Sequence, residues 1–223
     1  MKTLTKYIHE SLLDDFDEIE KSVDARELVI QFLKDNYRRA LVLKVSEKPN
    51  NDGYYEVDCS RRSVVEVYNK DITSLTNDLF IFVNIKGSFD CRSCKKLTSL
   101  EGAPKEVGGN FNCSYCHNLI SLKGAPQKVG DIFNCSYCDN LTSLEGAPNE
   151  VGGNFYCYSC KNLTSLKGAP EEIKYIFDLS NCDNLTSLEG APKKVRTWYN
   201  LGNVQSFDED DIKKVCSVTK IIT

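Results

Sequence analysis

A segment of 22 residues occurs five times in succession in this chain of 223 residues, and this repeat constrains the fold more than any other feature. Each copy contains a phenylalanine, at least one cysteine, a Leu-x-Ser-Leu step and Gly-Ala-Pro. The copies begin at Phe89, Phe111, Phe133, Phe155 and Phe177, and an eroded sixth copy begins at Tyr199. A unit this short cannot bury its apolar side alone, so successive units are expected to stack into a solenoid.

The pattern inside one repeat predicts a short strand followed by turns. Phe111 and Cys113 alternate with the polar Asn112 and Ser114, which is the period of a strand with one buried face. Gly-Ala-Pro then marks a bend, and no part of the repeat has the length or period of a helix. We expect an α+β protein, in which a β-rich solenoid of 22-residue coils forms a parallel sheet, with one strand per coil and a loop or 3₁₀ return.

One repeat position alternates in charge along the array: Glu101, Lys123, Glu145, Lys167 and Glu189. If the coils stack in register, each of these side chains lies between opposite charges, whereas like charges at such a spacing repel. The alternation therefore predicts stacking in register.

The repeat resembles the leucine-rich repeats, most closely their cysteine-containing and BspA-like types. The phrase that carries the resemblance is Phe-x-Cys-x-x-Cys-x-x-Leu-Thr-Ser-Leu, and it covers roughly residues 55–207. The resemblance implies a curved solenoid that binds proteins, in which the cysteine after the strand replaces a ladder-forming asparagine. Gly-Ala-Pro on the return departs from that family, so a flatter, β-rich rod is an equal expectation.

The eleven cysteines fall mostly into two columns of the repeat, and eight of them form four Cys-x-x-Cys pairs. Paired Cys-x-x-Cys units are typical of structural zinc sites and also of redox motifs. However, the first column continues as Leu179 and Leu201 and the second as Val204, and a metal ligand cannot be replaced in this way. We therefore interpret the cysteines as buried, reduced thiols, with no metal and no cofactor, and keep a zinc-binding module as a weaker alternative.

The two ends of the chain are expected to cover the open ends of the solenoid. Residues 1–54 predict two helices and a hairpin, residues 55–207 the solenoid with regular coils over 89–198, and residues 208–223 a capping helix and tail. Capping-box patterns place the two N-terminal helices after Ser11 and Asp24. In the C-terminal helix Asp208 is the predicted N-cap, and the predicted apolar face consists of Ile212, Val215 and Cys216.

The first eleven residues, MKTLTKYIHES, are similar to the capsid-targeting sequence of internal head proteins in large tailed bacteriophages. Tyr7, Ile8 and Glu10 match that pattern, and the resemblance implies proteolytic trimming between Glu10 and Ser11. The alternative is an ordinary amphipathic first helix through Ile8, Leu12, Phe16 and Ile19.

The outward positions of the strands are the expected binding surface, because the near-identical repeats vary most there. Apolar and aromatic residues gather at these positions in the later coils, and Asp178 lies on the same face. The candidate protein-binding residues are Ile132, Tyr156, Tyr158, Ile176, Asp178 and Trp198. Exposed aromatic residues on a rigid sheet are typical anchors for a protein partner. The alternative for Trp198 is that it shields the last coil.

These features favour a non-enzymatic scaffold. The chain has two histidines and a net charge of −4, which disfavours acid–base catalysis by histidine and nucleic-acid binding. We expect a phage-encoded factor that binds a host or phage protein, with no nucleic-acid partner and no membrane association. Acidic residues interrupt the position of a signal peptide, so the host cytoplasm is the expected location. The alternative is a structural or packaged protein of the virion.

Overall fold

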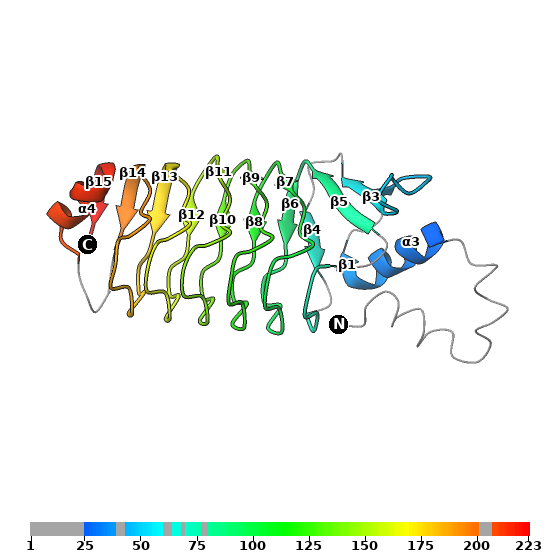
Figure 1. Ribbon diagram of the computed structural model, residues 1–223, viewed down its shortest axis with the longest axis horizontal. Coiled ribbons are helices and arrows are strands. Elements are labelled where there is room, and N and C mark those ends of the chain that lie inside the picture. The colour runs from blue at the N-terminus through cyan, green and yellow to red at the C-terminus, as the bar shows by residue number, and fades with distance from the viewer. Residues whose placement is uncertain (1–24, 39–42, 60–63, 68–69, 77–79, 201–206) are drawn as a thin grey trace.

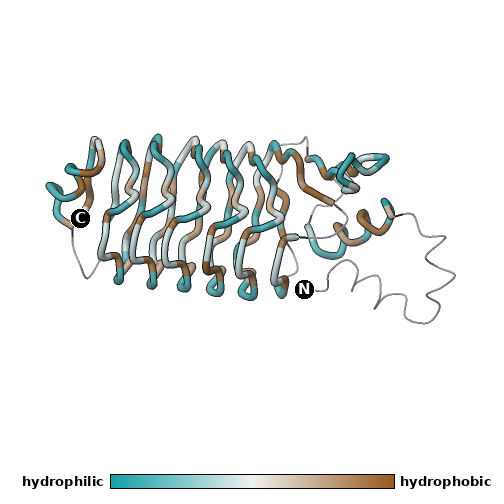
Figure 2. Tube along the Cα trace, viewed as in Figure 1, coloured by the Kyte–Doolittle hydropathy of each residue, from teal (hydrophilic) through white to brown (hydrophobic). Residues whose placement is uncertain are grey.

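The computed structural model describes residues 25–38, 43–59, 64–67, 70–76, 80–200 and 207–223. It is a β-solenoid whose coils are stacked side by side along the long axis of the molecule (Figure 1). The row of coils runs straight in this view, as expected for a β-rich rod. Figure 2 shows the same hydropathy pattern returning from coil to coil.

Each coil contributes to two parallel rows of strands. The first row contains β4 (Val64–Val67), β6 (Ser88–Asp90), β8 (Phe111–Asn112), β10 (Phe133–Asn134) and β12 (Phe155–Tyr156). The second contains β3 (Tyr55–Cys59), β5 (Phe80–Ile85), β7 (Glu106–Val107), β9 (Lys128–Val129) and β11 (Glu150–Val151). β13 (Glu172–Asp178) pairs with both β11 and β12, and β14 (Lys194–Tyr199) pairs with β13. The sequence predicted only the first row, because Phe-x-Cys alternation marks its strands, whereas a single apolar residue such as Val129 marks each second-row strand of the regular coils.

The coils stack in the predicted register of 22 residues. Phe89 pairs with Phe111, Phe111 with Phe133, and Phe133 with Phe155. The row of alternating charges forms ion pairs between coils, with 2.9 Å between Lys123 Nζ and Glu101 Oε1. The equivalent distance between Lys167 Nζ and Glu145 Oε1 is 2.8 Å.

Glycine separates the two strands of the early coils. A Cβ built on Gly130 would lie 2.1 Å from the carbonyl oxygen of Gly108 in the preceding coil, which is closer than side chains tolerate. Lys174 takes the equivalent position in the later coil, and there the two strands merge into the seven-residue β13. Glycine thus permits the closely packed corner at Gly108, Gly130 and Gly152, whereas Lys86 takes the same position between the separate strands β5 and β6.

The interior consists of aligned columns of identical or similar side chains. The central column is a row of fully buried rings whose neighbouring centroids are 5.0–5.7 Å apart: Phe89, Phe111, Phe133, Phe155, Phe177 and Trp198. The leucines of the Leu-x-Ser-Leu steps and the cysteines pack around this row. A continuous core therefore extends through every coil, which is how a solenoid buries what single repeats cannot.

The N-terminal cap contains one described helix and a hairpin (Figure 1). Helix α3 (Ala25–Asn36) agrees with the second predicted helix and buries Val29, Phe32 and Leu33. Strand β2 (Lys44–Val45) pairs antiparallel with β3 and forms the predicted hairpin. Strand β1 (Tyr37–Arg38) pairs antiparallel with β4. The predicted helix after Ser11 lies outside the described residues.

The C-terminal cap contains helix α4 (Glu209–Val215) and strand β15 (Ser217–Ile222). Asp208 is the N-cap as predicted, and its carboxylate accepts a hydrogen bond from the amide of Asp211 at 2.8 Å. Ile212 and Cys216 are buried, but Val215 is 43% exposed, so its predicted place on the buried face was wrong. β15 pairs parallel with β14 and extends the sheet by one strand where the sequence predicted only a tail.

Candidate interaction surface

Each strand of the first row in the regular coils is followed by a turn that repeats from coil to coil. The side-chain oxygen of Asn112 accepts a hydrogen bond from the amide of Ser114 at 3.0 Å, and Asn134 binds the amide of Ser136 in the same way. The next residue has a left-handed backbone, with φ of 60° at Tyr115. This conformation turns the chain away from the strand, so the residue at this position projects from the surface.

Four tyrosines from three consecutive coils meet at these turns. We call them the tyrosine ladder: Tyr115, Tyr137, Tyr156 and Tyr158. The rings of Tyr115 and Tyr137 are stacked, with centroids 4.3 Å apart and an interplanar angle of 12°. Tyr158 meets Tyr137 edge to face at 5.2 Å, and Tyr156 lies 6.3 Å from Tyr158. The ladder therefore forms one continuous aromatic cluster.

Polar neighbours fix the edges of the tyrosine ladder. Asn154 donates a hydrogen bond from Nδ2 to the Tyr156 hydroxyl at 2.8 Å. His117 Nδ1 lies 2.7 Å from Asp139 Oδ2 in the next coil, and its ring meets Tyr115 edge on at 6.3 Å. Tyr115 is 42% exposed and forms the outer end of the stack. Partial desolvation, followed by the interaction with Tyr137, raises the pKa of Tyr115.

The other sequence-predicted residues of this face have different surroundings. Ile132 and Ile176 are half-buried one position before the core phenylalanine, and their amides bind the side-chain oxygens of Asn110 and Asn154. Asp178 uses Oδ1 to accept the amide of Ser180 at 2.9 Å, so this carboxylate shapes the turn. The isoleucines thus lie in one column on either side of Asn154, beside the ladder.

Trp198 does not belong to this surface, and its predicted place in the exposed patch was wrong. A register shift in the pairing of β13 with β14 lies between Ile173 and Ile176, and it pairs Phe177 with Trp198 instead of Tyr199. Trp198 consequently enters the central ring column, is fully buried, and meets Phe177 at 5.1 Å and 79°. This position agrees with the alternative expectation, in which Trp198 shields the last coil.

Sequence reasoning missed Tyr115 and Tyr137. They occupy the column that reads Ser93, Tyr115, Tyr137, Ser159 and Asn181, directly after the outward positions that were compared. Two successive tyrosines in a column of small polar residues were the available signal. This column lies in the turn, where strand alternation no longer indicates which side chains are exposed.

The cysteines lie in the core and donate hydrogen bonds there. Continuation of the parallel ladder would direct the Ser136 amide to the carbonyl of Cys113, but this amide binds Asn134 instead. The thiol of Cys138 takes its place, with 3.4 Å between Sγ and the Cys113 oxygen. Cys116, Cys160 and Cys182 make the same contact at 3.2–3.3 Å. The second cysteine column therefore completes the backbone hydrogen bonding where the strands end.

The environment of the cysteines favours protonated thiols. All eleven are buried and unbridged. Desolvation raises the pKa of Cys94 to about 11 and that of Cys157 and Cys182 to about 12. Zinc ligation and nucleophilic chemistry both need the thiolate. In the part of the chain that the structure describes, no three His, Cys, Asp or Glu side chains form a group that could hold a metal ion.

The candidate processing residues Glu10 and Ser11 lie outside the described residues. Among those described, no helix is both long and apolar enough to cross a membrane. Comparison with known proteins gives no family model, no curated protein and no solved structure that matches this chain.

Proposed function

We propose that this protein is a non-catalytic scaffold that binds another protein through the tyrosine ladder on its outward sheet face. The observation that carries the proposal is the gathering of Tyr115, Tyr137, Tyr156 and Tyr158 from three coils into one aromatic cluster. Tyrosine is enriched at protein interfaces because one ring supplies both a large apolar area and a hydroxyl. It also has few rotatable bonds, so little conformational entropy is lost when it is covered.

The scaffold supports binding because it presents the ladder rigidly. The turns beneath the rings are held by side-chain-to-backbone hydrogen bonds, and the strands before them are paired on both sides. A preorganised surface of this kind loses little freedom on association, which favours affinity. Ile132 and Ile176 border the same face and are included in the proposed contact area.

The proposal includes a bacteriophage origin and a partner in the host cytoplasm, with packaging in the virion as the alternative. This part rests on the N-terminal sequence MKTLTKYIHES and its similarity to capsid-targeting sequences. Mass spectrometry of protein recovered from virions tests it. A chain that begins at Ser11 supports packaging and trimming, and an intact Met1 contradicts trimming.

The repeat itself supplies the variant that tests the tyrosine ladder. Each tyrosine can be replaced by the residue that neighbouring coils carry at the same position, so the backbone geometry is already accommodated. The substitutions are Tyr115→Ser, Tyr137→Ser, Tyr156→Asn and Tyr158→Ser, combined in one chain. The matched control is Ile120→Thr, which removes an apolar side chain that is 61% exposed and restores the threonine of the other coils.

Affinity capture from host lysate, quantified by mass spectrometry, compares the three chains. We expect a host protein that is retained by the wild type and by Ile120→Thr and is lost with the fourfold variant. Circular dichroism and thermal unfolding establish that the fourfold variant keeps its fold. A partner that the folded fourfold variant still retains would contradict the assignment of the surface.

A further inference from the structure

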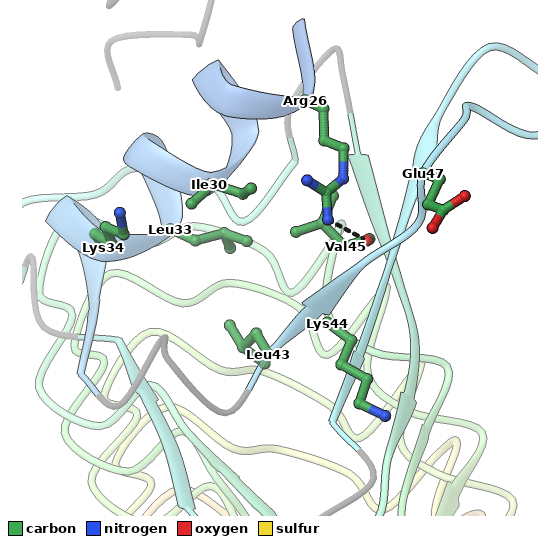
Figure 3. Close-up of a pocket in the computed structure, with 8 residues that line it drawn as sticks. All are labelled: Arg26, Ile30, Leu33, Lys34, Leu43, Lys44, Val45 and Glu47. Carbon is green, nitrogen blue, oxygen red and sulfur yellow. Dashed lines mark hydrogen bonds between the residues drawn. The ribbon is translucent and has the colours of Figure 1, made fainter. Parts of the chain in front are cut away.

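A cavity of about 400 Å³ lies in the N-terminal cap, between helix α3 and the hairpin strand β2 (Figure 3). Ile30 and Leu33 of the helix face Leu43, which precedes the strand, and Val45 adds a fourth apolar side chain. Leu33 is buried, whereas Ile30, Leu43 and Val45 are only half-buried. The cavity therefore has an apolar floor that the described residues leave partly open.

The rim of this cavity is mainly basic. Arg26, Lys34 and Lys44 line it together with a single carboxylate, that of Glu47, and the side chains of Lys44 and Glu47 point away from the helix (Figure 3). Arg26 reaches across from the helix and donates a hydrogen bond to the carbonyl oxygen of Val45 at 3.2 Å (Figure 3). It donates a second hydrogen bond to the carbonyl oxygen of Ser46 at 3.0 Å. Arg26 also forms an ion pair with Glu27, with 4.0 Å between Nη1 and Oε1, so one carboxylate of the helix lies near the rim as well. An occupant that combines apolar side chains with several carboxylates would match both the floor and the rim.

The chain contains such a segment just before the helix. Residues 11–20 read SLLDDFDEIE, with four large apolar side chains, five carboxylates and no lysine or arginine. This composition is complementary to the cavity in both respects. We propose that the acidic segment 11–20 binds in the cavity between α3 and β2 of its own chain and neutralises its basic rim.

The length of the connection permits this contact. The helix has 12 residues and is about 18 Å long at 1.5 Å per residue. Phe16 precedes Ala25 by nine residues, which span up to about 30 Å when extended. The segment can therefore return along the helix to any of the cavity-lining side chains from Arg26 to Lys34. Because it is tethered, its local concentration near the cavity is high.

Hydrogen exchange of the full-length chain, measured by mass spectrometry, tests the contact. We expect amides of residues 12–20 to exchange at least fivefold more slowly than in a free peptide of the same sequence. The variant Lys34→Glu/Lys44→Glu should remove most of this protection. Adding Asp14→Lys, Asp15→Lys and Asp17→Lys to that variant should restore it by reversing both charges. The control Lys105→Glu/Lys161→Glu makes the same charge change on exposed positions of the coils and should leave the protection unchanged.

Three results would overturn the proposal. The first is exchange of residues 12–20 at the peptide rate in the wild type. The second is protection that persists in Lys34→Glu/Lys44→Glu while the amides of α3 stay as protected as in the wild type. The third is protection that disappears on dilution, which would place the segment on a second copy of the chain. A further test of the basic rim needs no variants. Protection of residues 12–20 in the wild type should fall as the salt concentration rises from roughly 0.05 to 0.5 M. Protection that does not change with salt would contradict binding of the segment by the basic rim.

Discussion

The second cysteine column offers the sharpest test of how the coils are held together. Cys138 is fully buried, and its thiol donates a hydrogen bond to the carbonyl oxygen of Cys113. The Ser136 amide does not bind this oxygen, because it donates to the Asn134 side chain. Replacing Cys138 by alanine removes both the sulfur and this donor. Cys135 is the matched control, because its thiol contacts the Tyr156 carbonyl at 3.5 Å, but that oxygen already accepts the amide of Cys135 at 2.9 Å.

The expected magnitudes follow from this difference. Each alanine variant loses the burial of one sulfur, which is comparable to a methylene and contributes about 1 kcal/mol. Cys138→Ala additionally leaves a buried carbonyl without its donor, at a further cost of about 1–3 kcal/mol. We therefore expect Cys138→Ala to lower the free energy of unfolding by about 2–4 kcal/mol and Cys135→Ala by about 1 kcal/mol. Cys138→Ser keeps a donor and should lose less than Cys138→Ala.

Urea unfolding under reducing conditions measures these values. Repeat arrays can unfold in parts, so two probes are compared: circular dichroism and the fluorescence of Trp198, the single tryptophan. We expect their transitions to coincide, which validates a single free energy of unfolding. Equal losses from Cys138→Ala and Cys135→Ala, with unchanged slopes, would refute the hydrogen-bonding role of the thiol. A larger loss from Cys135→Ala would do so as well.

Three further predictions concern the core and the corners of the coils. Burial raises the pKa of most cysteine thiols, so above about pH 8.5 the unfolded chain releases protons that the folded chain retains. Stability should therefore fall with rising pH by about 1.4 kcal/mol per pH unit for each titrating thiol, and a urea midpoint that is equal at about pH 7.5 and pH 9.5 would contradict this. Gly130→Ala should lower stability by about 3 kcal/mol, because its Cβ meets the Gly108 oxygen at 2.1 Å. Gly53→Ala, at φ 85° with open space around it, should cost only about 1 kcal/mol, and similar losses from both would refute the close packing of the corner. Trp198 should emit at short wavelength and resist quenching by iodide until the chain unfolds, whereas quenching in the native state would contradict its burial.

The repeat made most of the fold predictable. Five near-copies define the columns of the core, and the alternating row from Glu101 to Glu189 indicates the register, which the ion pairs between coils confirm. The second strand row escaped prediction because a single apolar residue such as Val129 marks each of its strands in the regular coils, whereas Phe-x-Cys alternation marks the first row. β15 escaped because it is stabilised by pairing with β14, a contact that the local sequence does not reveal.

The candidate surface was less predictable, for two physical reasons. A one-residue register shift exchanges the buried and exposed faces of a strand, and this shift moved Trp198 from the predicted patch into the core. In addition, Tyr115 and Tyr137 project because of a left-handed backbone after the strand, where strand alternation no longer applies. Tyr156 and Tyr158 lie within or next to the strand, so alternation placed them correctly on the outward face.

The central claim is that the thiols are packing and hydrogen-bonding groups inside the stacked coils. Alkylation of the folded, metal-free and reduced chain, followed by mass spectrometry of the intact protein, tests it most directly. We expect less than one modified cysteine per folded chain, under conditions in which the urea-unfolded chain is modified at all eleven. Modification of several cysteines in the folded chain, at the rate of the unfolded one, would contradict it.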